Sequence, residues 1–327
     1  MFNNNAKVIG LLTATLVFNG CWSNPSTTSD IDQLTDETSC YKDASKTCYK
    51  KVIKRGRTFE AVYQAGSFKP FRRLSDSGRF DPGTSPEVRF QRMWDSNPGW
   101  VMASLSHAAY LTDREELKAL LSYIGAEADD NYIFDVNNHQ GYLAVFPDKA
   151  ILVFRGTEPD EFPDLLVDAN ILTDKFEGIR VHKGFYKATI EVWHGAGIEQ
   201  KLNSVSKNLT DSSNIYVTGH SLGAALAVDS GFLYEFREIV TFGQPRVAKD
   251  DLRPLLKGNP RYLRYINGND KVTDVPPEEL GWQHSGTANN IKDQDGAFTG
   301  VLPYPINLDH SPLNYAYILF SQTPSFN

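Results

Sequence analysis

The stretch NIYVTGHSLGAALAV, residues 214–228, decides the fold. Its first part, residues 214–218, is rich in β-branched and aromatic side chains and predicts a strand, and a helix-forming stretch that runs to residue 234 follows it. Between them stands Gly219-x-Ser221-x-Gly223. A serine on so tight a strand-to-helix turn needs strained backbone angles, and a side chain at either flanking position would clash. The pattern predicts a nucleophile elbow, in which the serine hydroxyl lies at the N-terminus of a helix whose dipole favours negative charge.

Outside this stretch, strands and helices alternate from about residue 100 onward. Strands are expected at residues 141–146, 150–154, 238–242 and 262–266, and helices at 100–111 and 115–124. Such alternation implies a mostly parallel sheet whose connections are helices. The sequence therefore predicts the α/β class, with an α/β-hydrolase fold: a mostly parallel central sheet with helices on both faces.

The predicted nucleophile needs a histidine and an acid later in the chain. A serine hydroxyl is a poor nucleophile until a histidine accepts its proton, and that histidine needs a carboxylate to fix its tautomer. In this fold the acid and then the histidine follow the serine along the chain. Only His284 and His310 follow Ser221. We favour His310, which precedes a final apolar segment, with His284 as the alternative. The acid is expected just after the last strand, because catalytic groups of open α/β sheets gather at that edge; Asp270 is the first choice and Asp274 the second.

Several ordered segments carry a resemblance to a known family. They are Phe154-Arg155-Gly156-Thr157, Val181-His182-Lys183-Gly184-Phe185, Gly219 to Gly223, Thr241-Phe242-Gly243-Gln244-Pro245-Arg246-Val247 and Asn269-Asp270-Lys271-Val272. With them, residues 95–320 resemble the class 3 lipases, the family of filamentous-fungal triacylglycerol lipases with bacterial and plant relatives. The resemblance implies that Asp270 is the acid, that His310 is the base, and that backbone N–H groups of Thr157 and Leu222 form the oxyanion hole. One departure is that no proline directly follows Val272, which keeps Asp274 open as the acid.

The family also carries a short lid helix after the oxyanion segment. Here Phe162, Leu165, Leu166 and Ala169 recur at helical spacing. An amphipathic lid would hide its apolar face in water and open at a lipid surface, whereas an ordinary helix packed on the core is the alternative. The resemblance places a tryptophan where Leu165 stands.

The resemblance implies hydrolysis of carboxylic esters of lipids, of the triacylglycerol lipase or phospholipase A1 type. The reaction would pass through an acyl-Ser221 intermediate and would need no metal or organic cofactor. One alternative is an esterase for soluble or polysaccharide-linked acyl esters. Another is a catalytically inactive lipid-binding protein of the cell envelope.

The first 20 residues predict a signal peptide. Lys7 precedes an apolar run, residues 8–18, of the right length for the core of a signal peptide and too short to span a membrane. The sequence Phe18-Asn19-Gly20-Cys21 resembles a bacterial lipobox, so we expect Cys21 to be lipidated, with ordinary secretion as the alternative. The protein is then expected in the bacterial cell envelope, at the outer membrane, or outside the cell.

The remaining segments complete the expected organisation. Residues 21–49 form a tether, in which Cys40 and Cys48 would pair as a disulfide in an exported protein, with two free thiols as the alternative. Residues 50–95 form an N-terminal extension, rich in Lys and Arg, that could face anionic lipid or only solvent. Residues 96–327 form the catalytic domain. A net charge of -7 argues against nucleic acid as a partner, so the expected partners are an ester substrate and a membrane surface.

Overall fold

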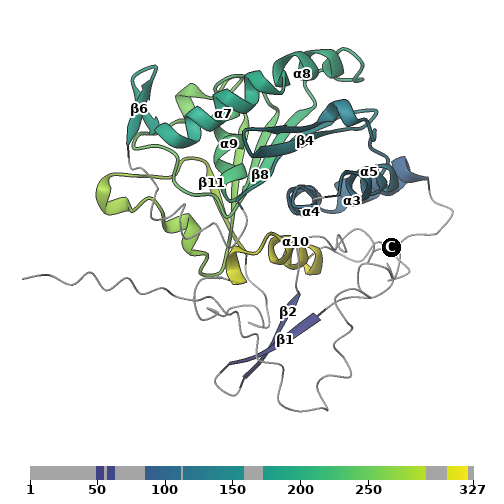
Figure 1. Ribbon diagram of the computed structural model, residues 1–327, viewed down its shortest axis with the longest axis horizontal. Helices are drawn as coiled ribbons and strands as arrows, with labels where there is room; N and C mark the ends of the chain where they lie inside the picture. Colours follow the sequence, from purple (N-terminus) through teal and green to yellow (C-terminus); the bar gives the residue numbers. More distant parts are fainter. Residues whose placement is uncertain are drawn as a thin grey trace, which may run out of the picture. The chain divides into compact units, whose positions relative to one another are not determined.

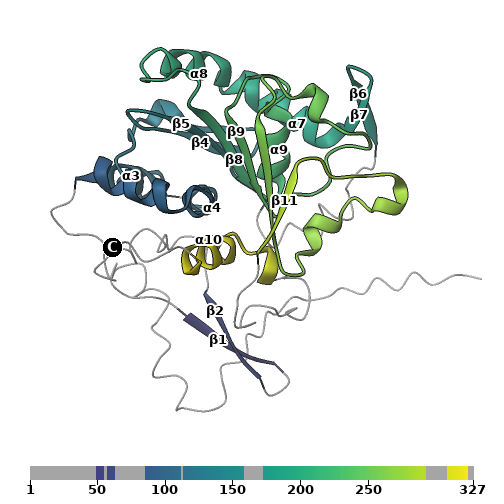
Figure 2. The same ribbon diagram turned by 180° about the vertical axis from the view of Figure 1, so that it is seen from behind.

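The computed structural model describes residues 49–54, 57–62, 85–111, 113–157, 172–291 and 308–322 (Figure 1). Within these residues, seven strands form one sheet in the order β11 (Thr287–Ile291), β10 (Arg261–Asn267), β9 (Glu238–Phe242), β8 (Ile215–His220), β5 (Ala150–Phe154), β4 (His139–Val145) and β3 (Ile133–Val136). The five strands from β11 to β5 run parallel, whereas β4 and β3 are antiparallel to their neighbours. Figure 2 shows the twisted sheet from behind.

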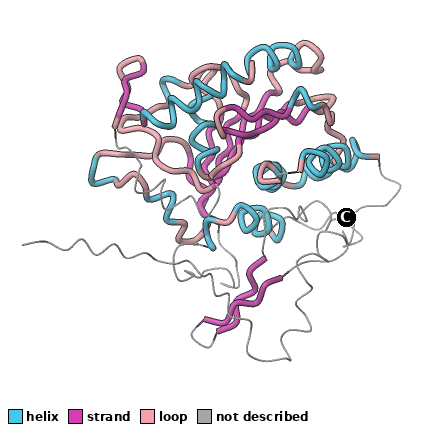
Figure 3. Tube along the Cα trace, viewed as in Figure 1, coloured by secondary structure: helices cyan, strands magenta, loops and turns pink. Residues whose placement is uncertain are grey.

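Helices cover both faces of this sheet (Figure 3). Alternate side chains of β5 supply the two cores: Ile151 and Val153 join one cluster, and Leu152 and Phe154 join the other, as expected for a strand whose side chains alternate between faces. The first cluster takes its helical residues from α3 (Pro86–Ser96), α4 (Pro98–Ala108), α5 (Arg114–Tyr123) and α10 (Pro312–Ser321). The second takes them from α7 (Lys183–Gly195), α8 (Ile198–Ser206) and α9 (Leu222–Ser230). The expected α/β-hydrolase fold is confirmed.

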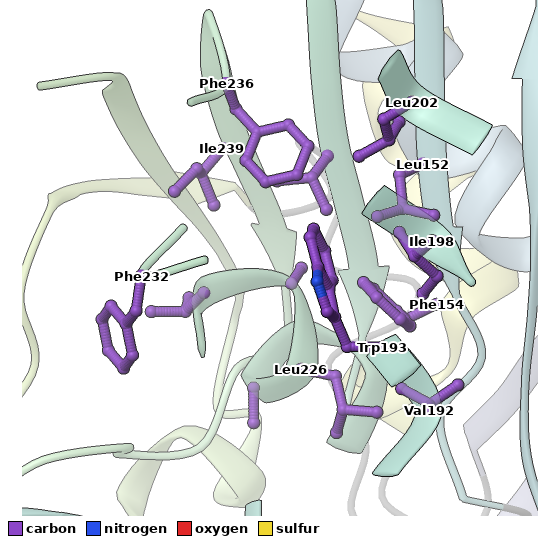
Figure 4. Packing of buried hydrophobic residues seen from close by; sticks show 14 of the residues in the cluster. Leu152, Phe154, Val192, Trp193, Ile198, Leu202, Leu226, Phe232, Phe236 and Ile239 are labelled. Atoms are coloured by element: carbon purple, nitrogen blue, oxygen red, sulfur yellow. The ribbon is translucent and has the colours of Figure 1, made fainter. Parts of the chain in front are cut away.

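Trp193 anchors the second core. It projects from α7 toward Leu152 and Phe154 of β5 and lies beside Leu226 of α9 (Figure 4). The side chain is only 3% exposed. A tryptophan removes about 200 Å² from water, which stabilises the docking of the helix by on the order of 4 kcal/mol. This contact therefore holds α7 against the sheet and beside α9, the helix that follows Ser221.

The strands and helices expected from residue 100 onward are confirmed, with ends that shift by a few residues. Helices α3, α7 and α8 were not expected. Around α3, Asp81-Pro82-Gly83 and Asn97-Pro98-Gly99 indicate turns in residues 76–98. Helix α3 begins after Ser85, whose side chain accepts a hydrogen bond from Val88 N at 3.4 Å. Its Phe90 and Met93 are buried in the first cluster. The core of the folded body therefore includes residues ahead of the boundary expected at residue 96.

Two small antiparallel hairpins stand outside the large sheet. One pairs β1 (Tyr49–Lys54) with β2 (Arg57–Val62). The other pairs β6 (Thr173–Phe176) with β7 (Ile179–His182). In the part of the chain described above, no helix has the length and apolar character needed to cross a membrane. The expected signal peptide, tether cysteines and lid residues (Cys21, Cys40, Cys48, Phe162, Leu165 and Leu166) lie outside the described residues.

Candidate active site

Ser221 occupies the turn between β8 and α9 and has the strained backbone that the elbow requires. Its φ of 59° and ψ of -126° fall in a region that residues with a side chain rarely adopt, at a cost of about 1–3 kcal/mol. The two glycines permit this turn, because a Cβ at Gly219 would overlap the Gly223 carbonyl and a Cβ at Gly223 would overlap the Phe154 carbonyl. Ser221 is 0% exposed, and its Oγ makes no hydrogen bond within the described residues.

Asp270 and His310 meet at the C-terminal edge of the sheet. Asp270 follows β10, and His310 ends the short 3-10 helix η6 (Leu308–His310). His310 Nδ1 lies 2.9 Å from Asp270 Oδ2. Because a carboxylate can only accept, Nδ1 carries the proton of this bond in neutral His310. Nε2 is then the basic nitrogen, which is the tautomer that a general base needs.

Two further donors hold the Asp270 carboxylate in place. Tyr315 Oη donates to Asp270 Oδ2 at 2.6 Å, and Val272 N donates to Oδ1 at 2.9 Å. The tyrosine oxygen also accepts from Asn267 N at 3.0 Å. Burial raises the pKa of Tyr315 well above its ordinary value, so its hydroxyl stays protonated as a donor. Tyr315 was not among the site residues predicted from the sequence, although a tyrosine inside a buried apolar segment needs a partner for its hydroxyl.

His220 supports His310 through the backbone. The His220 Nε2 to His310 O distance is 2.6 Å, and Tyr110 Oη lies 2.8 Å from His220 Nδ1. Burial, with His310 adding to its effect, lowers the pKa of His220 well below its usual value. A neutral His220 therefore donates from Nε2 to the His310 carbonyl and accepts from Tyr110. His220 thus acts as a hydrogen-bonding residue that links Tyr110 to the backbone of His310.

The alternative acid and base lie elsewhere. His284 Nε2 donates to Thr273 O at 2.8 Å, and burial, followed by the effect of Arg264, lowers the pKa of His284 to about 3. Asp274 is exposed and pairs with Lys271 at 3.1 Å. Since neither side chain joins the Asp270–His310 pair, the geometry favours Asp270 and His310 over the alternatives.

The segment that carries Thr157 approaches Ser221, and Leu222 follows Ser221 in the chain. Gly156 lies so near that a Cβ on it would come within 2.9 Å of Ser221 Cβ. This approach places Thr157, the next residue, at the same edge of the sheet. Leu222 is the first residue of α9, and the first N–H groups of a helix have no partner within it. In the described part of the chain, no group of three or more His, Cys, Asp or Glu side chains is arranged to hold a metal ion.

Comparison with known proteins adds a family match. Residues 151–280 match the family model described as lipase (class 3). Over 122 residues the chain is 32% identical to the secreted mono- and diacylglycerol lipase LIP4 of Malassezia restricta, which covers 33% of this chain and 38% of the relative. It is 31% identical over 157 residues to a lipase of Rhizopus niveus, covering 43% and 38%. The chain thus spans less than two fifths of the length of these relatives.

Solved structures of lipases are also similar. Lipase II from Rhizopus niveus superposes with a TM-score of 0.49 at 21% identity, covering 68% of this chain and 93% of that chain. A lipase from Rhizopus microsporus var. chinensis gives a TM-score of 0.47 at 21% identity, covering 62% and 74%.

Proposed function

We propose that this protein is a serine carboxylic-ester hydrolase that acts on lipid esters through an acyl-Ser221 intermediate, and the match of residues 151–280 to the family model described as lipase (class 3) supports this. The observation that carries the proposal is the pairing of His310 Nδ1 with Asp270 Oδ2 at 2.9 Å at the sheet edge where Ser221 stands in a strained turn. Strain of this kind is stored at functional sites when the surrounding structure enforces it.

The chemistry follows from these positions. His310 Nε2 takes the proton of Ser221 Oγ as the oxygen attacks the ester carbonyl carbon, and Asp270 stabilises the imidazolium that forms. The tetrahedral intermediate collapses to acyl-Ser221, and the leaving alcohol receives the proton from His310. Water then attacks the acyl carbonyl with His310 again as base, and acyl-Ser221 releases the carboxylic acid. In the structure, Ser221 Oγ has no hydrogen bond among the described residues; such contacts commonly tighten only when substrate is bound.

The negative charge of the intermediate needs donors. We assign the backbone N–H groups of Thr157 and Leu222 to the carbonyl oxygen of the tetrahedral intermediate. Leu222 begins α9, whose dipole adds to the effect at the helix N-terminus. Loss of one such donor typically costs about 3–4 kcal/mol of transition-state stabilisation.

The proposed substrates are esters with an apolar acyl chain. The family match supports this class, and the names of two matched relatives specify mono- and diacylglycerols for those proteins. The same triad and oxyanion donors can hydrolyse triacylglycerols, phospholipids at one acyl position, and soluble acyl esters. A lid at Phe162, Leu165 and Leu166 would favour substrates presented at a lipid surface.

The test is ester hydrolysis by the full chain, kept soluble with mild detergent. Nitrophenyl esters from short to long acyl chains, a triacylglycerol emulsion and phosphatidylcholine vesicles are compared for wild type, Ser221→Ala and Ser213→Ala. Ser213 is an exposed serine before β8 and serves as the matched control. We expect Ser221→Ala to fall to background while Ser213→Ala keeps full activity. Equal rates in wild type and Ser221→Ala would refute the proposal, whereas activity confined to short soluble esters would favour the esterase alternative.

We also propose that the chain is exported and anchored through a lipid on Cys21. The basis is the apolar run and the lipobox-like sequence before Cys21. Growth with a radiolabelled fatty acid in a bacterial host should label the wild-type chain and leave Cys21→Ser unlabelled. Equal labelling of both chains, or none of either, would contradict the anchor.

A further inference from the structure

Arg264 is a buried charge, and two of its three guanidinium nitrogens have no hydrogen-bond partner among the described residues. It stands in β10 and is only 6% exposed. Its Nε and Nη1 are buried and make no hydrogen bond to any described residue. A guanidinium stays charged in proteins, and burying a charge without a partner is strongly unfavourable. The fold therefore leaves at this point a positive charge that needs a negative ligand.

The neighbouring strands supply no acid to Arg264. In the register of the parallel sheet, Arg264 lies beside Ala288 of β11 and Thr241 of β9, and such partners lie on the same face. Ala288 has no polar side chain. The Thr241 hydroxyl already bonds to Gln244 Oε1 at 2.8 Å.

The basic side chains near Arg264, those of Arg246 and His284, act as hydrogen-bond donors, so they cannot neutralise its charge. Burial lowers the pKa of the Arg264 guanidinium, and the positive charge of nearby Arg246 lowers this pKa further. The guanidinium of Arg246 donates to the carbonyls of Asp274 and Pro276. His284 is also electrostatically coupled to both arginines, and its Nδ1 is buried without a hydrogen bond among the described residues.

We propose that Arg264, with Arg246 and His284 around it, binds a small inorganic anion of halide size. Because Arg264 is only 6% exposed, a large anion could not reach its guanidinium, and the two guanidinium groups supply charge of the matching sign. A bound anion would offset the cost of the buried charge, as a paired carboxylate does elsewhere.

The site lies next to the loop that carries the candidate acid. His284 Nε2 donates to Thr273 O at 2.8 Å, and Thr273 Oγ1 donates to Asp270 O at 2.8 Å. Arg246 bonds the carbonyls further along the same loop. An anion at Arg264 would thus fix the groups that brace this loop, so anion binding is expected to stabilise the folded chain.

The first test is thermal unfolding of the full chain at constant ionic strength, with bromide replacing gluconate, an anion too large for the site. We expect the Tm of wild type to rise saturably, by about 5–10 °C at a bromide concentration roughly 100-fold above Kd. Arg264→Met should lose this response. Ala288→Glu puts a carboxylate beside Arg264, so it should have a raised Tm without bromide and no bromide response. Should Arg264→Met fail to fold, Ala288→Glu still decides the matter.

The second test is anomalous scattering from crystals soaked in bromide. The proposal expects a bromide peak within about 3.5 Å of an Arg264 nitrogen in wild type, and none there in Ala288→Glu. A water molecule at that place, a direct Arg264–His284 hydrogen bond, or an equal bromide response of wild type and Ala288→Glu would overturn the proposal. Ester hydrolysis measured on the same samples keeps this outcome separate from the proposed function.

Discussion

Replacement of Asp229 by asparagine should stabilise the protein at neutral pH. Asp229 lies in the last turn of α9, is 1% exposed, and neither carboxyl oxygen has a hydrogen bond among the described residues. Burial raises the pKa of Asp229 well above its ordinary value of 3.8. In the unfolded chain the group ionises near pH 4. Keeping Asp229 protonated in the folded protein at pH 7 therefore lowers the free energy of unfolding by up to about 4 kcal/mol, at 1.36 kcal/mol per pH unit. Asparagine has nearly the same shape and no proton to lose.

The pH dependence gives this prediction a sign. A carboxyl with a raised pKa in the fold stabilises least at high pH, so stability falls as pH rises above about 4. The difference in unfolding free energy between Asp229→Asn and wild type should be near zero at pH 4. It should grow by about 1.4 kcal/mol per pH unit until the folded pKa is reached. Urea unfolding at pH 4, 5.5 and 7 measures it. A difference that does not change with pH, or an asparagine variant that is less stable at pH 7, would show that burial of the Asp229 carboxyl does not destabilise the fold at neutral pH.

Asp250, a partly exposed carboxyl, provides a control in which the pH dependence of stability has the opposite sign. Hydrogen bonds from Arg180, at 2.8 Å from N and 2.7 Å from Nη2, lower the pKa of Asp250 to about 2. Ionised Asp250 therefore stabilises the folded protein above about pH 4, and this contribution is lost as pH falls toward 2. Asp250→Asn should therefore be less stable than wild type at pH 7, with the deficit shrinking at low pH.

Two further variants probe the candidate site. Tyr315→Phe removes the 2.6 Å hydrogen bond to Asp270 Oδ2. It should lower kcat about tenfold, for a loss near 1.4 kcal/mol, whereas Tyr142→Phe, which loses a buried 2.7 Å bond to a backbone carbonyl, should destabilise the fold and leave kcat unchanged. A similar kcat loss in both would show that Tyr315 acts through stability alone. Gly156→Ala puts a methyl against Tyr110 Oη, the His220 carbonyl and, at 2.9 Å, Ser221 Cβ. It should reduce kcat about 100-fold or more, and near-normal turnover would contradict the closeness of this segment to the site.

Much of the fold could be predicted because the central strands carry strong local signals. The stretches at 150–154 and 238–242 are short apolar runs with clear turns beside them, and the structure has strands with those bounds. The elbow was readable because Gly219 and Gly223 are needed by backbone approaches that a side chain would block.

Other elements could not be predicted from their local sequence. Helix α3 follows turn signals, and its helical character depends on burial of Phe90 and Met93 against distant parts of the chain. Strand β11, with the sequence TANNI, has little apolar pattern, because it is the edge strand and only Ile291 is buried. The support of the Asp270–His310 pair is also tertiary: Tyr315 reaches Asp270 over 45 residues.

The central claim is that Ser221 is the nucleophile of an ester hydrolase. It is tested most directly by treating the full chain with a fluorophosphonate and locating the adduct by mass spectrometry. We expect one adduct, on the peptide that contains Ser221, formed in proportion to the loss of ester hydrolysis and absent after His310→Asn, which removes the base. Full inactivation without an adduct on Ser221, or ester hydrolysis that persists after Ser221 is fully labelled, would contradict the account.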